Sequence, residues 1–272
     1  MTASAADSIE VRRGAEKSSP TLSALVVARN EEQRLAACLE RLAFADEIVV
    51  VLDRSTDRSA EIAHSFKARV LEGGWEREGE RRNAGIDACR GDWILEVDAD
   101  EWVPPELGAE IRHAIASAAG GYFLIPFANH VGDHLVRHGW GAYNGVAQKA
   151  ALFHRGAKRW GEGRVHPKIT LTGERRQLHQ RILHFVDRDI SEMFQRLNRY
   201  TDLAALDAIE SGKLPAFGHS LRRIWSRAWK SYVARRGYRE GAYGVALALF
   251  SACYPILIYL KTVVRPPDEE RR

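Results

Sequence analysis

The first half of this chain alternates short apolar runs with segments of helical periodicity, and no other feature restricts the fold as much. The apolar runs lie at residues 22–28, 47–52, 68–71, 93–98 and 121–127. Between the first two, Leu35, Cys38, Leu39 and Leu42 recur every three or four residues, which predicts a helix that opens near residue 29. Repeated strand–helix units predict an α/β fold with a mostly parallel sheet and helices on both faces.

Changes in composition predict three regions. Residues 1–20 are polar and predict a disordered tail, and residues 21–188 form the α/β domain. Within that domain the sequence pattern changes after residue 127. Shorter and more polar strands are expected there, at 146–155, 164–171 and 177–184. From Asp189 the periodicity is helical again, so residues 189–265 are expected to form a C-terminal helical region.

Two carboxylates, Asp98 and Asp100, follow the apolar run 93–98 directly. In open α/β sheets, ligands bind just beyond the carboxyl ends of the strands. Mg²⁺ and Mn²⁺ prefer oxygen ligands and are often held by one or two carboxylates together with substrate phosphates. The pair therefore predicts a divalent-cation site that faces a phosphate group.

Two common nucleotide-binding loops are absent. The first strand is followed by ARNEE, so the chain has neither Gly-x-Gly-x-x-Gly nor a P-loop at this point. A nucleotide must then be held by acids and polar groups at the strand ends. Asp53 ends the second strand and can accept hydrogen bonds from a ribose or a uracil-type N–H, while Arg54 and Arg82 can face phosphate charge.

The segments VVARNEE, VVVLDRSTDRS and GERRNAGIDACRGDWILEVDADE together resemble the family-2 glycosyltransferases of the GT-A fold, which use nucleotide-sugar donors. The resemblance makes residues 21–127 the nucleotide-sugar half of a catalytic domain and 128–188 its acceptor half. It implies that Asp98 and Asp100 form the metal motif for Mg²⁺ or Mn²⁺, with Asp100 the more direct ligand and Asp98 also on the donor side. The implied nucleoside pocket is lined by Ala28, Asn30, Glu31 and Asp53, and the implied donor-phosphate residues are Arg82 and Asn83.

The second half is similar to the branch of that family that builds the lipopolysaccharide inner core, through WGEGRVH, His184, LNRYT, GYREG and YLK. Much of that branch has Val-His-Glu where this chain has Val165-His166-Pro167, so the expected carboxylate is missing. An inverting transfer needs a base that takes the acceptor proton. The candidate bases are Glu162, His166 and Asp187.

A basic, aromatic segment precedes a long uncharged one near the C-terminus. Residues 213–239 hold eight Lys or Arg residues and no acid, and Trp225 and Trp229 recur at helical spacing. This pattern is typical of a helix at a membrane surface. Residues 241–260 carry no charge and are long enough to span a bilayer, lie in its interface or form a core helix. A nucleic-acid partner is disfavoured because no binding motif accompanies the charge.

The leading hypothesis is an inverting, metal-dependent glycosyltransferase on the cytoplasmic face of the inner membrane, attached peripherally or by one segment. It would move a hexose, glucose by the resemblance, from a UDP-type donor to a lipid-anchored glycan such as the lipopolysaccharide inner core. Three alternatives stay open: transfer to a polyprenyl phosphate, nucleotidyl transfer, and a non-catalytic binding module tethered to the membrane.

Overall fold

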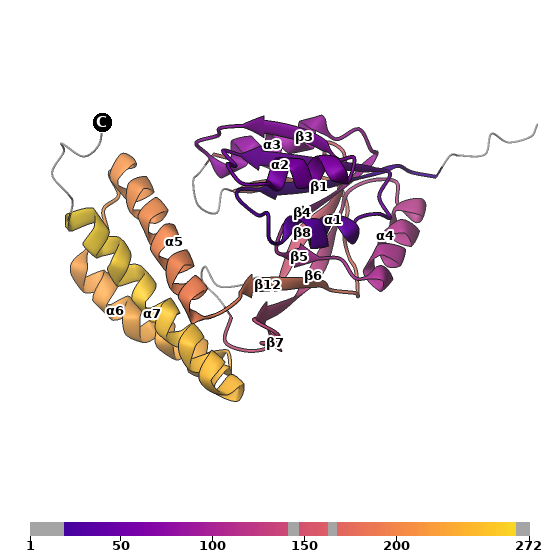
Figure 1. The fold of residues 1–272 in the computed structure, drawn as a ribbon. Coiled ribbons are helices and arrows are strands. Elements are labelled where there is room, and N and C mark those ends of the chain that lie inside the picture. The colour runs from indigo at the N-terminus through magenta and orange to yellow at the C-terminus, as the bar shows by residue number, and fades with distance from the viewer. Residues whose placement is uncertain (1–18, 141–146, 163–167, 265–272) are drawn as a thin grey trace, which may run out of the picture.

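The computed structural model describes residues 19–140, 147–162 and 168–264. The predicted tail therefore falls outside the described residues except for its last two, and the candidate base His166 falls outside them too. An α/β part and a group of long C-terminal helices lie side by side (Figure 1). The chain enters the helical group directly after the last strand of the sheet.

The main sheet has the strand order β3-β2-β1-β4-β8-β6-β12-β5. Its first four strands are parallel, β8 runs antiparallel between β4 and β6, and β6 and β12 are parallel to each other. Two further strands pair with β6, and β9 and β10 form a separate ribbon. The strands are β1 Leu22–Ala28, β2 Glu47–Asp53, β3 Arg69–Gly73, β4 Trp93–Asp98, β5 Glu101–Trp102, β6 Tyr122–Val131, β7 His134–Leu135, β8 Gln148–His154, β9 Lys158–Trp160, β10 Ile169–Leu171, β11 Arg175–Gln177 and β12 Ile182–Asp187.

Helices cover both faces of this sheet, as the alternating pattern predicts. Side chains of a strand point to opposite faces in turn, so a run that is apolar throughout can serve two cores. In β1, Leu22 and Val26 face the cluster that includes residues of α1, α2 and α4, whereas Leu25 and Val27 face the cluster under α3. The helices are α1 Leu35–Glu40, α2 Ser59–Ser65, α3 Glu78–Ala88 and α4 Pro105–Ser117.

The helix expected from residue 29 begins only at Leu35, so that boundary was wrong. The chain leaves β1 through Asn30, whose φ of 55° is left-handed and ends regular structure. The Asn30 side chain accepts a hydrogen bond from Thr56 N, and Glu31 N donates to Ser59 Oγ. Side-chain hydrogen bonds thus connect the loop after β1 to the loop after β2. This connected loop occupies the residues where the first turn of the helix was expected.

Two strand boundaries in the second half also differ from expectation. The strand expected at 177–184 is two strands, because the chain turns after Gln177 and only Ile182 onward pairs beside Phe127. The strand expected at 164–171 is described only as β10, Ile169–Leu171. The strand expected at 146–155 is present as β8, and its antiparallel direction could not be read from its composition.

Three long helices form the C-terminal region. They are α5 Ile190–Glu210, α6 Phe217–Trp229 and α7 Gly241–Val263, with a π-helical turn Lys230–Ala234 and a 3-10 turn Gly237–Glu240 joining the last two. Asp189 caps α5 by accepting a hydrogen bond from Glu192 N at 2.8 Å. The stretch Gly237–Val263 is long and apolar enough to cross a membrane by length and composition.

Helix α7 requires glycine at the position where it packs against the turn that precedes it. An added Cβ at Gly244 would overlap the carbonyl oxygen of Gly237, whereas one at Gly218 in α6 would meet open space. We expect Gly244→Ala to destabilise the protein by about 1–3 kcal/mol because the turn must move. Gly218→Ala should stabilise it by about 0.5 kcal/mol through helix propensity. Urea unfolding of both variants measures this, and equal midpoints would contradict the packing described here.

Candidate active site

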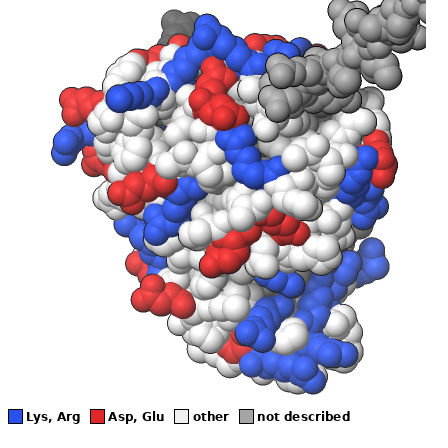
Figure 2. All heavy atoms as spheres, turned by 90° about the vertical axis from the view of Figure 1, so that its right-hand side faces the viewer, with Lys and Arg blue, Asp and Glu red and all other residues white. Residues whose placement is uncertain are grey.

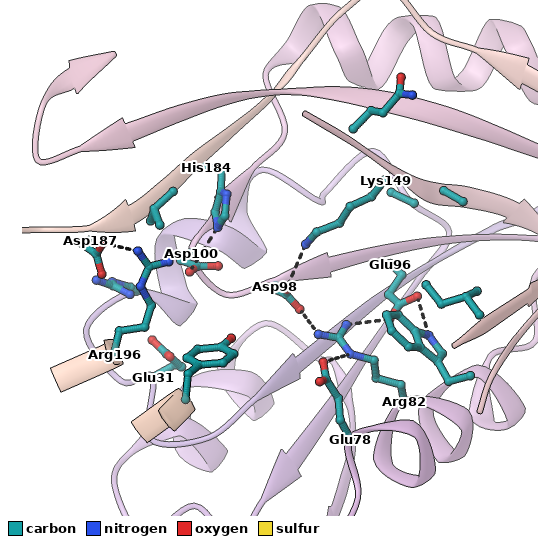
Figure 3. A pocket seen from close by; sticks show the side chains of 18 of the residues that line it. Glu31, Glu78, Arg82, Glu96, Asp98, Asp100, Lys149, His184, Asp187 and Arg196 are labelled. Carbon is teal, nitrogen blue, oxygen red and sulfur yellow. Dashed lines mark hydrogen bonds and ion pairs between the residues drawn. The ribbon is translucent and has the colours of Figure 1, made fainter. Parts of the chain in front are cut away.

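A cavity of about 790 Å³ lies between the sheet and helix α5 (Figure 3). Asp98 and Asp100, at the end of β4, line its sheet side together with Lys149 of β8 and His184 of β12. Its other wall is formed by side chains of α5. Those side chains are Glu192, Gln195, Arg196, Arg199 and Tyr200.

Strand direction explains how these groups meet. β8 runs antiparallel to β4, so β8 begins where β4 ends, and Lys149 near its start arrives beside Asp98. β12 pairs with the short β5, and His184 lies opposite Glu101 in that pairing. The first residues after β4 therefore meet side chains from two strands that follow much later in the chain.

Asp98 is held by two cations. Its Oδ1 accepts a hydrogen bond from Arg82 Nη2 at 3.0 Å, and its Oδ2 accepts one from Lys149 Nζ at 2.9 Å. Burial acts to raise the pKa of Asp98, but Arg82 and Lys149 hold that pKa well below its ordinary value. Both oxygens of Asp98 are engaged in this arrangement, so its role as a metal ligand stays a prediction.

A chain of ion pairs extends from Asp98 along the wall of the cavity. Arg82 also donates to Glu78 Oε1 at 2.9 Å and to Glu96 Oε1 at 2.7 Å. Glu96 Oε2 in turn accepts from Lys158 Nζ at 2.7 Å, and the two residues are 4% and 3% exposed. Burial alone would raise the pKa of Glu96, but Lys158 and Arg82 lower it, so the carboxylate stays charged.

Asp100, Glu101 and His184 could together hold a metal ion, since one ligand atom of each lies within 4.8 Å of the others. His184 Nδ1 lies 2.9 Å from Asn129 Oδ1 and donates to it, which directs Nε2 toward Asp100 Oδ2 at 3.6 Å. Glu101 is fully buried and binds Lys149 and the backbone N–H of Asp98. Asp100 offers the carboxylate oxygens that suit Mn²⁺ or Mg²⁺, His184 adds an imidazole nitrogen, and Glu101 lies beside both.

Asp187 lies at the end of β12 and lines the same cavity. Its Oδ2 accepts a hydrogen bond from Arg196 Nη2 at 2.6 Å. Its Oδ1 is buried and has no hydrogen-bond partner among the residues that the structure describes. Burial raises the pKa of Asp187 to about 6, with Glu192 and Asp100 adding to the shift and Arg196 and Arg34 opposing it.

The structure brings five of the predicted site residues to this cavity: Glu31, Arg82, Asp98, Asp100 and Asp187. Burial, followed by the charge of Asp100, raises the pKa of Glu31 to about 7. The candidate base Glu162 is not among the residues lining the cavity. Its side chain is 87% exposed and pairs with Arg77 at 3.0 Å.

The other predicted donor residues lie outside the main cavity. Asn30 lines a second, adjoining cavity of about 700 Å³ that shares Glu31 with the first. Asp53 is buried and accepts hydrogen bonds from Trp75 N and Arg54 Nε, both at 3.1 Å. Ala28 is buried in the core, and Asn83 exchanges two hydrogen bonds with the backbone of Trp160. Their donor-binding roles stay predictions.

Sequence reasoning gave no role to Lys149, Lys158 or Arg196. Lys149 and Lys158 meet their carboxylates across 51 and 62 residues of chain. Arg196 meets Asp187 where β12 passes into α5. No local pattern records these contacts. His184 appears in the resemblance without a role, although one signal was available. It is a polar residue inside the apolar run Ile182–Asp187, at a position whose side chain faces the cavity.

Comparisons with known proteins define the class. A family model described as glycosyl transferase family 2 matches residues 23–169, more than half of the chain, so the chain belongs to that family. The lipopolysaccharide core biosynthesis glycosyltransferase LpsC of Rhizobium meliloti (strain 1021) is 25% identical over 252 residues, which cover 90% of this chain and 92% of LpsC. An uncharacterized glycosyltransferase of Rickettsia bellii (strain RML369-C) is 26% identical over 81% of this chain and 78% of its own.

Among solved structures, glucosyl-3-phosphoglycerate synthase from Mycobacterium tuberculosis, in complex with Mn²⁺, UDP and glucosyl-3-phosphoglycerate, is similar with a TM-score of 0.35 and 22% identity. The match covers 41% of this chain and 44% of that one, so no residue role follows from it.

The protein is therefore a glycosyltransferase that uses a nucleotide-sugar donor, and it resembles the lipopolysaccharide core branch of its family. The expected α/β fold is confirmed, including a long apolar helix near the C-terminus. Membership of the family sets aside two alternatives, nucleotidyl transfer and a non-catalytic binding module.

Proposed function

We propose that this enzyme is an inverting, metal-dependent hexosyltransferase that moves glucose from UDP-glucose to a lipid-anchored glycan of the lipopolysaccharide inner-core type. It would act at the cytoplasmic face of the inner membrane. One observation carries the mechanism: a single cavity holds the Asp100–His184 pair and, on the same side as α5, the buried carboxylate of Asp187. The near full-length similarity to LpsC supports the class of acceptor.

The donor end of the cavity is organised around Asp98 and Asp100. Asp100 and His184 would hold a divalent cation, which would supply Lewis-acid stabilisation of the negative charge that develops on the leaving diphosphate. Arg82 and Lys149 fix the orientation of Asp98 through its two oxygens, so that this carboxylate needs no reorganisation during the reaction.

The acceptor end is organised around Asp187. Inversion forms a bond from an acceptor hydroxyl oxygen to the anomeric carbon while the bond from that carbon to the diphosphate breaks. Asp187 Oδ1 would take the proton of the hydroxyl, because Oδ2 is occupied by Arg196 and Oδ1 has no hydrogen-bond partner among the described residues. Of the three candidate bases, Asp187 alone is a described residue that lines the cavity, and its pKa of about 6 suits a base near neutral pH.

Transfer to a polyprenyl phosphate is the second candidate. Arg199 lines both cavities, and the cavity wall on α5 also carries Arg196. These guanidinium groups suit a phosphate acceptor, which is already ionised and needs no strong base. The two candidates therefore differ in how much activity depends on Asp187.

Donor selectivity tests the proposed function directly. Purified protein is titrated with UDP-glucose, UDP-galactose, UDP-N-acetylglucosamine and GDP-mannose, in Mn²⁺, Mg²⁺ or EDTA, by calorimetry. Transfer to deacylated core oligosaccharide and to a polyprenyl phosphate is then followed with the donor that binds. We expect metal-dependent binding of UDP-glucose and transfer to the oligosaccharide. Preference for another sugar would overturn the donor assignment.

Asp187→Asn should lower transfer to a hydroxyl acceptor by roughly 10²–10⁴-fold, since general-base catalysis contributes that much. In the unaltered enzyme, kcat/KM should fall as the pH falls through about 6, because the base must be a carboxylate and protonation removes it. Groups that face Asp187 and shape this titration are Arg196, Glu192, Asp100 and Arg34.

The matched control for this variant is Glu162→Gln, which should change transfer little because Glu162 lies exposed outside the cavity lining. Donor binding should be the same in both variants. An Asp187→Asn enzyme that retains near-full activity with an unchanged pH profile would refute Asp187 as the base and favour the polyprenyl-phosphate acceptor.

A further inference from the structure

Helix α6 exposes a row of large apolar side chains. Phe217, Leu221, Trp225, Trp229 and Val233 follow one another at intervals of four residues, and this row is called the α6 stripe below. All five are exposed, and Trp225 and Trp229 reach 76% and 65%. The helix packs on its neighbours through another side, where Ser220 and Ser231 are buried. At one end of the stripe the Phe217 ring lies 5.3 Å from that of Tyr259 on α7, whereas the exposed Trp225 and Trp229 lie outside the bundle core.

Positive charge flanks this stripe and continues around the turn to α7. Arg222 is exposed on α6, Lys230 is exposed at the start of the π-helical turn, and Arg236 and Arg239 are exposed before α7 begins. No Asp or Glu occurs between Lys213 and Arg239. Figure 2 shows Lys and Arg side chains gathered at the lower end of the molecule, the level at which the α6–α7 turn lies in Figure 1.

Helix α7 is held inside the bundle. Lys261 near its end donates to Asn198 Oδ1 at 2.7 Å and to Thr201 Oγ1 at 2.8 Å, both on α5. Leu247 and Phe250 pack in one cluster with Met193 and Leu197 of α5. A bilayer-spanning α7 would have to give up these contacts and the close fit of Gly244 against Gly237.

We propose that the α6 stripe is a docking surface for an anionic lipid bilayer, in which α6 lies in the plane of the interface while α7 stays in the bundle and does not cross the membrane. Trp and Tyr side chains favour the membrane interface, and basic residues beside them favour anionic headgroups. This inference rests on the proposed function only for its purpose, which is to bring the cavity to a lipid-linked acceptor.

The charge pattern is what favours a lipid surface over a protein partner. An exposed apolar row is a general sign of an interaction site. Here the row has only positive charge beside it along 27 residues, which matches a uniformly negative surface rather than the mixed charges of a typical protein partner. In-plane binding also uses the exposed side of α6 without disturbing any buried contact.

Vesicle flotation measures binding of the protein to a bilayer and needs neither donor nor acceptor. A negative result would therefore refute docking without refuting the proposed function. The probes are phosphatidylcholine vesicles with and without phosphatidylglycerol. We expect binding only with phosphatidylglycerol, release by high salt, and roughly tenfold weaker binding for Trp225→Ser/Trp229→Ser. Lys230→Gln/Arg236→Gln should weaken binding and reduce its salt dependence. Hydrolysis of UDP-glucose in detergent should be unchanged in both variants.

The matched control is Val245→Ser/Leu249→Ser, which removes two exposed apolar side chains from α7 instead. It should bind vesicles like the unaltered protein. Loss of binding in this control, or protein that resists both high salt and alkaline carbonate in cell membranes, would show that α7 is the membrane element and overturn the proposal. Equal binding by the α6 variant and the unaltered protein, or no binding to either vesicle, would overturn it too.

Discussion

Replacing Asp100 with alanine is expected to reduce glycosyl transfer by roughly 10²–10³-fold while leaving the fold intact. Asp100 and His184 are the donors that suit a divalent cation, and the alanine variant keeps only the imidazole. The carboxylate makes no contact that the core depends on, and its removal relieves repulsion with Asp98. The measurements are kcat with a Mn²⁺ titration and, independently, Mn²⁺ binding by calorimetry in the presence of UDP.

Glu80→Ala provides a matched control, because Glu80 is an exposed carboxylate on α3 outside the cavity. It should bind Mn²⁺ and transfer sugar as the unaltered enzyme does. Should Asp100→Ala retain both Mn²⁺ affinity and turnover, the cation site proposed at Asp100 and His184 would be wrong.

Glu96→Ala is expected to have the largest effect on stability, a loss of about 3–5 kcal/mol. The substitution removes the carboxylate that pairs with Lys158, which is 3% exposed. Among the described residues, the Lys158 ammonium then keeps the carbonyl oxygen of Ala150 at 2.9 Å and the ring faces of Phe153 and Trp160. It also releases one arm of Arg82. Although Lys158 lines the cavity, its ammonium is almost fully buried, so the loss of its counter-charge is costly. Urea unfolding followed by circular dichroism measures the loss.

The double variant Glu96→Leu/Lys158→Met distinguishes the buried charge from simple loss of packing. Removing both partners leaves no unpaired charge at Lys158, so most of the stability should return. A double variant as unstable as Glu96→Ala would mean that the cavity left in the core, not the orphaned ammonium, causes the effect.

The carboxylates that end strands are the part of the candidate site that could be predicted from the sequence. Asp98 and Asp100 follow a run whose apolar character marks a buried strand, and the carboxyl end of such a strand is where ligands bind. Asp187 could be predicted from the sequence for the same reason, because it ends the run Ile182–Asp187. Such inferences need only the local pattern and the general geometry of parallel sheets.

The partners of these acids could not be predicted in the same way. Lys149 reaches Asp98 because β8 is antiparallel, and direction is set by how the whole chain crosses the sheet. Likewise, the loop after β1 is shaped by Ser55 and Ser59, whose hydroxyls accept hydrogen bonds from Asn30 N and Glu31 N across 25 and 28 residues. The helical periodicity of residues 35–42 does not indicate these hydrogen bonds between the two loops.

Helix α5 serves both the cavity and the helical bundle from neighbouring positions of one face, since residues three and four apart are neighbours on a helix. Arg196 and Tyr200 face the cavity, while Met193 and Leu197, one turn away, pack against α7. Truncation before Ile190 would therefore remove one wall of the cavity as well as α6 and α7. Under the two proposals, α5 joins the acceptor side of the cavity to the bundle that carries the α6 stripe. Chimaeras between relatives should therefore exchange acceptor preference and membrane binding together. No boundary within α5 separates the residues of the cavity from those of the bundle.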